Sequence, residues 1–130
     1  MSEVPYAHRR EFTRVPVHLR AEVTAEGRLH RDGTMEDVSL KGGFFRSAAP
    51  PAEGVPCDVR LHLEGTPIVV HATGRVVRSG PAGCAIQFTE IIGLDSLEHL
   101  RHVILFNAQD IARVEQEFHQ HLGLREDVDD

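Results

Sequence analysis

Residues 37–42 read DVSLKG and fit the pattern D-x-S-x-x-G. Upstream of this stretch, residues 10–14 read REFTR and fit R-x-x-x-R. The chain has 13 Arg among its 130 residues, so the arginine pattern is expected about once by chance, whereas the D-x-S-x-x-G pattern is expected roughly 0.03 times. The second pattern is therefore the informative one, and the first gains meaning from its position just before it.

The residue types in these two motifs suit an anionic nucleotide. Arg10 and Arg14 can each pair with a phosphate or meet the O6/N7 edge of guanine as a planar fork. Asp37 can accept hydrogen bonds from the N1–H and N2–H₂ donors of guanine, and Ser39 can bond a base or a phosphate. Gly42 has no Cβ, which lets the backbone approach a ligand closely.

Each motif also has a simpler interpretation. The arginines can belong to a solvated N-terminal segment. Asp-x-Ser followed by Gly42 and Gly43 can be an ordinary turn between strands, because Asp and Ser stabilise turns and Gly supplies positive φ. The combination of both motifs with the strand pattern that follows favours a ligand site.

The chain pattern is that of a small all-β domain. Val15 to Val23 and Val55 to Leu63 alternate between apolar and polar residues, which is typical of strands with one solvated face. Glu26-Gly27 reads as a hairpin turn. Further strands are expected at residues 29–38, interrupted near Asp32-Gly33, at 43–46, at 68–78 with a bulge at Gly74, and at 83–88. The sequence predicts a mainly β fold, a six-stranded antiparallel β-barrel over residues 15–92, which leaves no exposed strand edge.

A long C-terminal α-helix is expected over residues 93–122. Asp95 is the expected helix cap, and Glu98 completes a capping box. Positions 97, 104, 111 and 118 are apolar and form a seven-residue repeat, and a helix of about 25 residues would be nearly 40 Å long. Either the helix lies on its own domain, or its later turns pair with a second subunit as a short coiled coil. The length of the helix favours the second arrangement, a homodimer.

The two ends of the chain are expected to lie outside the barrel and the helix. Residues 1–14 are expected to be a mobile arm with the arginine motif, and residues 123–130 an acidic tail. No signal peptide or membrane-spanning run is visible, so a cytoplasmic protein without membrane insertion is expected.

Cys57 and Cys84 lie on expected strands without metal-ligand spacing, and are interpreted as buried free thiols.

Charge is distributed unevenly along the chain. The net charge is −6, which argues against a nucleic acid polymer as partner. Residues 1–46 have 8 basic and 7 acidic residues, whereas residues 47–130 have 6 and 13. Both motifs thus lie in the more basic part, which suits a small anionic ligand held locally.

The two motifs, in this order at the start of a barrel pattern, resemble the PilZ domain, a bacterial receptor family for cyclic di-GMP. The run from Gly74 to Arg78, followed by Gly83 to Phe88, is similar to the last two barrel strands of that family. The resemblance covers residues 8 to 106. It implies cyclic di-GMP as the ligand, no other cofactor, and an arginine segment that closes over the ligand and changes a surface read by a downstream protein.

The resemblance also implies a set of ligand-binding residues: Arg9, Arg10, Arg14, Asp37, Ser39, Gly42 and Gly43. Arg9 corresponds to an extra arginine that some members use to bind a second, stacked ligand. His8, Arg75 and Arg78 could also line the site, although solvated positions explain these three more simply.

Three other classes of function fit the sequence less well. No catalytic motif such as H-E-x-x-H or G-x-S-x-G is present, and the nine His are scattered, so an enzyme is not expected. A small nucleic-acid-binding barrel would need basic strands with aromatic residues, which are scarce here. The serious alternative is a PilZ-like protein-interaction module that binds no nucleotide; such members usually lack one of the two motifs.

Overall fold

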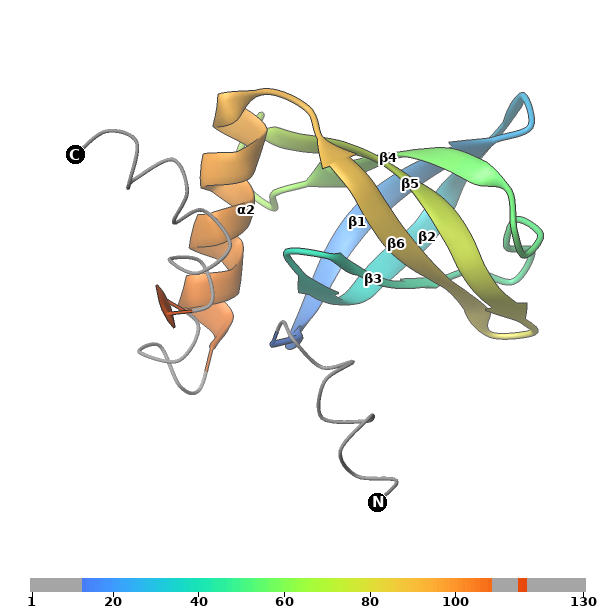
Figure 1. The fold of residues 1–130 in the computed structure, drawn as a ribbon, viewed down its shortest axis with the longest axis horizontal. Helices are drawn as coiled ribbons and strands as arrows, with labels where there is room; N and C mark the ends of the chain where they lie inside the picture. The colour runs from blue at the N-terminus through green and yellow to red at the C-terminus, as the bar shows by residue number, and fades with distance from the viewer. Residues whose placement is uncertain (1–12, 109–114, 117–130) are drawn as a thin grey trace, which may run out of the picture.

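The computed structural model describes residues 13–108 and 115–116 of the chain, which form six β-strands and one helix (Figure 1). The strands are β1 (Val15–Ala25), β2 (Arg28–Ser39), β3 (Gly42–Arg46), β4 (Pro56–His62), β5 (Val69–Gly80) and β6 (Gly83–Ile91). They are followed by α2 (Leu94–Asn107). The order of elements is the one that the sequence predicts.

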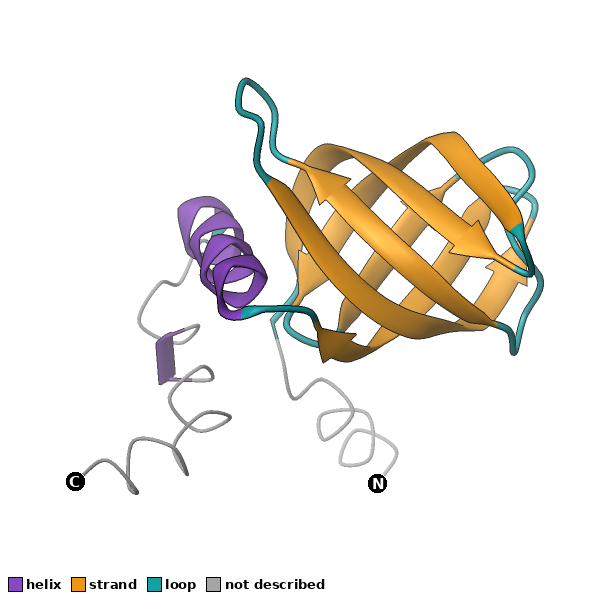
Figure 2. Ribbon diagram, turned by 90° about the horizontal axis from the view of Figure 1, so that it is seen from above, coloured by secondary structure: helices purple, strands orange, loops and turns teal. Residues whose placement is uncertain are grey.

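The six strands close into an antiparallel barrel with the order β1-β2-β3-β6-β5-β4. Closure occurs where β4 pairs with β1 in antiparallel register, Ala21 opposite Leu61 and Val23 opposite Val59. Figure 2 shows the closed barrel with the helix against one end of it. The predicted six-stranded β-barrel is therefore confirmed, and each strand finds hydrogen-bonding partners on both sides.

Side-chain alternation places the core inside the barrel. In β1, Val15, Ala21 and Val23 are buried while His18 and Arg20 between them are exposed. The same alternation in β4 buries Cys57, Val59 and Leu61. The largest fully buried side chains are Phe45, Met35, Leu61, Leu100 and Ile104.

Turns and bulges lie close to the positions that the sequence predicts. Glu26 and Gly27 both have positive φ, 53° and 75°, as a two-residue hairpin turn requires. Gly74 lies at a register shift between β5 and β6, which confirms the predicted bulge. The expected interruption near Asp32-Gly33 is a shift in register against β1 within one continuous strand.

Both cysteines are buried free thiols, as predicted. Burial raises the pKa of the Cys57 thiol to about 11, and the neighbouring Asp58 carboxylate adds to the effect. Burial and the nearby Cys57 raise the pKa of Cys84 to about 12. Both side chains are therefore protonated at neutral pH and behave as small apolar groups.

The helix begins differently from the sequence-based prediction. It starts at Leu94, its N-cap is Gly93 with φ 88°, and no side chain caps it. The predicted capping box of Asp95 and Glu98 is therefore wrong. Because the chain enters the helix through a glycine two residues earlier, Asp95 lies inside the first turn. Its carboxylate there still interacts favourably with the positive end of the helix dipole.

The helix is also shorter than expected. It ends at Asn107, whose side-chain amide donates to the carbonyl of Val103 at 2.8 Å, and Ala108 is extended. Glu115 and Gln116 are again helical, so the predicted uninterrupted helix over residues 93–122 is wrong. Leu100 and Ile104 are buried where α2 packs against β5, β1 and β6. Positions 111 and 118 of the seven-residue repeat lie outside the described residues, as do most of the predicted arm and the tail, so the coiled coil stays a prediction.

Among the residues that the structure describes, no helix is both long enough and apolar enough to cross a membrane.

Candidate ligand-binding site

The D-x-S-x-x-G motif forms the hairpin between β2 and β3. Asp37 and Ser39 belong to the end of β2, and Gly42 begins β3 opposite Ser39. The turn between them is fixed to the next strand, because the N–H of Phe88 in β6 donates to the carbonyl of Lys41 at 2.7 Å. The motif is thus built on paired backbone, which gives a rigid base for a site.

Asp37 is held by its own hairpin. A register shift between β2 and β3 lies between Met35 and Asp37, and it sets Asp37 opposite Phe44. The backbone N–H of Phe44 donates to Asp37 Oδ1 at 3.1 Å. The carboxylate is therefore oriented by the backbone of the neighbouring strand, and its side chain remains 31% exposed.

The two motifs meet at Asp37. Arg14, directly before β1, has its Nη1 3.8 Å from Asp37 Oδ1, and its side chain is 42% exposed. The contact follows from the register of β1 on β2, in which Pro16 lies opposite Asp37. Arg9 and Arg10 lie outside the described residues, so of the predicted arginines only Arg14 is placed at the site.

Ser39 has a different environment from the one expected of a ligand contact. It is only 3% exposed, and its Oγ accepts the N–H of Lys41 at 3.0 Å. This is the local turn bond that Ser commonly makes. In this structure Ser39 stabilises the hairpin, and its direct contact with a ligand stays a prediction.

Gly42 and Gly43 have a packing role. A Cβ on Gly42 would overlap the carbonyl oxygen of Ile86 in β6, and one on Gly43 would overlap the carbonyl oxygen of Asp37 in β2. Both glycines let β3 lie close to its two neighbours, which explains their presence without a ligand. Contact between these glycines and a ligand stays a prediction.

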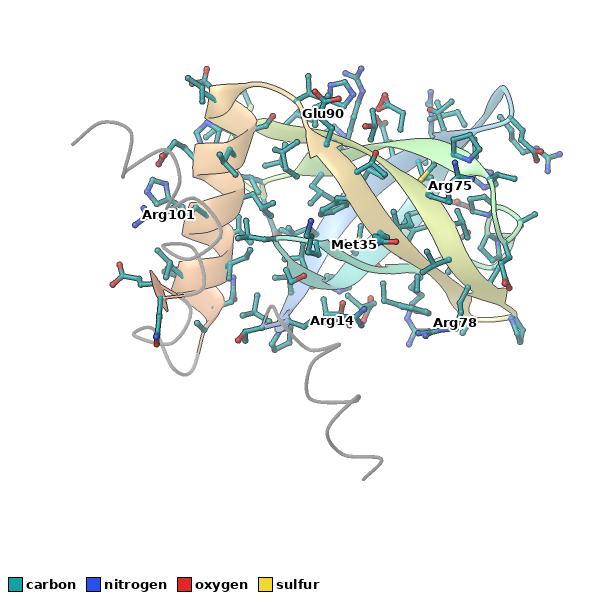
Figure 3. The ribbon with its side chains drawn as sticks, in the orientation of Figure 1. Arg14, Met35, Arg75, Arg78, Glu90 and Arg101 are labelled. Carbon is teal, nitrogen blue, oxygen red and sulfur yellow. The ribbon has the colours of Figure 1, made fainter. Side chains whose placement is uncertain are left out.

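The register of the sheet aligns a row of residues across β2, β3, β6 and β5, of which Ala85 is buried and the others reach the outer surface. Asp37 lies opposite Phe44, Phe44 opposite Ala85, and Ala85 opposite Arg78. Three strand spacings separate Asp37 from Arg78, about 14 Å. Arg14 and Arg78 both lie along the lower edge of the barrel in Figure 3. Arg75 instead donates to the carbonyl of Gly54 at 2.6 Å.

Phe44 is the aromatic residue of this row, and it belongs to neither sequence motif. Its ring is half-buried on the outer surface and lies over Gly83, where a Cβ would come within 2.9 Å of the ring. Phe45, the next residue, is fully buried inside the barrel. Two adjacent aromatic residues in a strand face opposite sides, so the pair Phe44-Phe45 was the signal that one ring lies outside.

Within residues 13–108 and 115–116, no three His, Cys, Asp or Glu side chains are arranged to hold a metal ion. The candidate site consists of a carboxylate, an arginine and an aromatic ring on the outer surface of a closed barrel.

The sequence profile of the PilZ domain family matches residues 8–106. The chain therefore belongs to the PilZ domain family, generally a family of cyclic di-GMP receptors and adaptors and typically without enzymatic activity. No curated protein shows significant sequence similarity.

Two solved structures have the same fold. The Bacillus subtilis inhibitor of motility, MotI/DgrA, matches with a TM-score of 0.61 and 18% identity over 78% of this chain. The chain covers 53% of that protein, about half of its length. The PilZ domain of CeSA from a cellulose-synthesising bacterium matches with a TM-score of 0.55 and 21% identity, over 72% of this chain and 96% of that domain.

Proposed function

We propose that the chain is a cyclic di-GMP receptor that binds the nucleotide on the outer surface of β2 and β3. The observation that supports this most is the 3.8 Å approach of Arg14 to Asp37, which joins the two motifs in one place. An exposed arginine can pair with a phosphate, and an oriented carboxylate beside it can accept the two N–H donors of guanine.

The carboxylate of Asp37 determines the choice of base. Both of its contacts in the described part of the chain use Oδ1. Oδ2 and the remaining lone pair of Oδ1 would then accept from the guanine N1–H and N2–H₂ pair. Adenine lacks this pair of donors, so cyclic di-AMP would not satisfy the carboxylate. The half-buried ring of Phe44, opposite Asp37 in the ladder, supplies a surface on which a base can stack.

The arginine arm is the moving part of the proposed receptor. Asp37 is fixed by the hairpin, whereas Arg9 and Arg10 precede the barrel, and charge-assisted bonds to the phosphates would draw them over the ligand. The closed arm and the barrel then present a changed surface to a downstream protein in the cytoplasm. Arg9 is the residue that would contact a second, stacked ligand molecule.

Calorimetry with the intact chain tests the proposal. Cyclic di-GMP should bind with micromolar or tighter affinity, and cyclic di-AMP at the same concentration should give at least about a hundredfold weaker binding, because it leaves the carboxylate unpaired. Equal affinity for the two dinucleotides would contradict the role of Asp37. No binding of cyclic di-GMP at about 100 µM would reject the receptor and favour a PilZ-like interaction module.

A further inference from the structure

A second surface lies away from the proposed nucleotide site, between α2 and the barrel. It is a groove of about 790 Å³ between the start of β1, the β4–β5 turn and the helix. Its walls are mainly apolar and only partly buried, and include Val17, Leu19, Ile68, Val103 and Phe106. Apolar surface of this kind that is left open to water is a candidate for an interaction site.

Phe106 distinguishes this groove from an ordinary surface depression. Its side chain is 89% exposed, the highest value among the large apolar residues that the structure describes. It lies on the helix side of the groove, one turn beyond Val103, so a large uncovered ring and an apolar groove of open volume lie next to each other. A surface with both features can pair with a copy of itself, since each ring can enter the groove of the other copy.

We propose that this groove is the interface of a homodimer, in which Phe106 of each protomer inserts into the groove of its partner. The inference goes beyond the proposed receptor function and does not depend on it. The dimer forms on the groove side of α2, because positions 97 and 104 of the predicted coiled-coil repeat face the barrel of their own chain.

The polar groups at the two rims of the groove are complementary, as hydrogen-bond acceptor and donor, under two-fold symmetry. Glu64 lies on the rim formed by the β4–β5 turn, whereas His99 and His102 lie on the helix rim. A two-fold axis along the groove brings each helix rim against the turn rim of the partner. The Glu64 carboxylate of one protomer then meets the imidazole N–H donors of the other, which favours this pairing over one that joins like rims.

The area involved sets the expected strength of the dimer. An aromatic side chain buries about 150–250 Å², so the two Phe106 rings together supply about 300–500 Å². A stable interface buries about 1,200–2,000 Å², so the groove walls and rims must supply the rest. This predicts a dimer at the weaker end of specific interfaces, with a Kd of about 1–50 µM.

Sedimentation equilibrium of the full chain without nucleotide tests the interface. The wild type should be dimeric at about 200 µM and dissociate on dilution below the micromolar range. Phe106→Ser should raise the Kd at least about tenfold, since a central aromatic anchor is lost. Leu94→Ser is the matched control, because Leu94 is also on α2 and 77% exposed but does not line the groove.

Either of two results would overturn the proposal: a wild type that stays monomeric at about 200 µM, or a Leu94→Ser variant that dissociates as much as Phe106→Ser. Circular dichroism should show unchanged folding in both variants, because both positions are exposed.

A second measurement changes the charges at the two rims of the groove. Glu64→Arg and His102→Glu should each weaken the dimer, and their combination should restore it. A double variant weaker than both single variants would contradict the rim pairing.

Discussion

Two acidic residues, on the two strands that flank β1, have similar arginine contacts but different surroundings. Asp37 in β2 lies 3.8 Å from Arg14, and Asp58 in β4 lies 3.8 Å from Arg60. Their side chains are about equally exposed, 31% and 35%. Asp58, however, also has both carboxylate oxygens at 2.7 and 2.8 Å from His71 Nε2, whereas Asp37 contacts other described residues through Oδ1 alone.

The difference separates a structural carboxylate from one that can receive a ligand. Asp58 and His71 satisfy each other across the β4–β5 ladder, and His71 also donates its backbone N–H to Ser96 of α2 at 3.0 Å. That side of the barrel therefore fastens the helix. Asp37 is oriented by a backbone N–H and has acceptor capacity left for a second donor pair. An ion pair alone thus does not distinguish a candidate ligand-binding carboxylate; among the described residues, the remaining acceptor capacity of Asp37 does.

The largest effect on stability is expected at Gly42, where β3 begins in the hairpin that holds Asp37. Gly42→Ala places a Cβ against the carbonyl of Ile86, and we expect it to lower the free energy of unfolding by about 3 kcal/mol. Gly80→Ala is the matched control, because no atom lies within 4 Å of its added Cβ, and its effect should stay below about 0.5 kcal/mol. Urea denaturation measures both. Equal stability of the two variants would show that β3 is not tightly packed at Gly42.

Removal of each carboxylate gives the sharpest functional comparison. Asp37→Ala should weaken cyclic di-GMP binding at least about a hundredfold, because hydrogen bonds between guanine and a charged acceptor are lost. Asp58→Ala should leave the affinity within about twofold and instead lower the unfolding free energy by about 1 kcal/mol, since His71 loses its partner. Calorimetry and urea denaturation of both variants give the four values. Weaker binding in Asp58→Ala would remove the distinction between the two sides.

Arg14 and Arg60 should differ in their effect on cyclic di-GMP binding in the same direction as the two carboxylates, but by a smaller factor. Arg14→Ala should weaken cyclic di-GMP binding about tenfold, because one phosphate contact is lost while Arg10 remains. Arg60→Ala, which breaks an ion pair of the same length, should change it by less than about twofold. Arg14→Lys should resemble Arg14→Ala, since Lys cannot form the planar fork. A Lys variant with wild-type affinity would reduce the role of Arg14 to charge alone.

The barrel could be predicted from the sequence because its strands have one face in water. Alternation in β1 and β4 therefore shows which residues face the core. The end of α2 could not be predicted, because the apolar spacing continues past Asn107, while the helix ends there with a bond from the Asn107 side chain to Val103.

The candidate site could be predicted only in part, because some of its features depend on local contacts. Asp37 and Arg14 could be selected from motif spacing, and the β1–β2 register brings them together. The burial of Ser39 depends on a local bond to the N–H of Lys41, and the position of Asp37 opposite Phe44 depends on a shift in the ladder. Neither the turn bond nor the shift has a pattern of its own in the sequence.

The buried thiol of Cys57, next to Asp58, gives the smallest expected effect and concerns the structural side of the barrel. Its pKa is about 11 in the folded chain and 9.0 when unfolded, so above pH 9 the unfolded state loses the proton first. Stability is therefore unaffected at neutral pH and falls as the pH rises from 9 towards 11, by about 1 kcal/mol near pH 9.5. Cys57→Val keeps the volume, and its free energy of unfolding should fall less than that of the wild type over this range. Parallel curves for the two proteins, measured by urea denaturation between pH 7 and 10, would show that Cys57 is not held in its neutral form by the barrel.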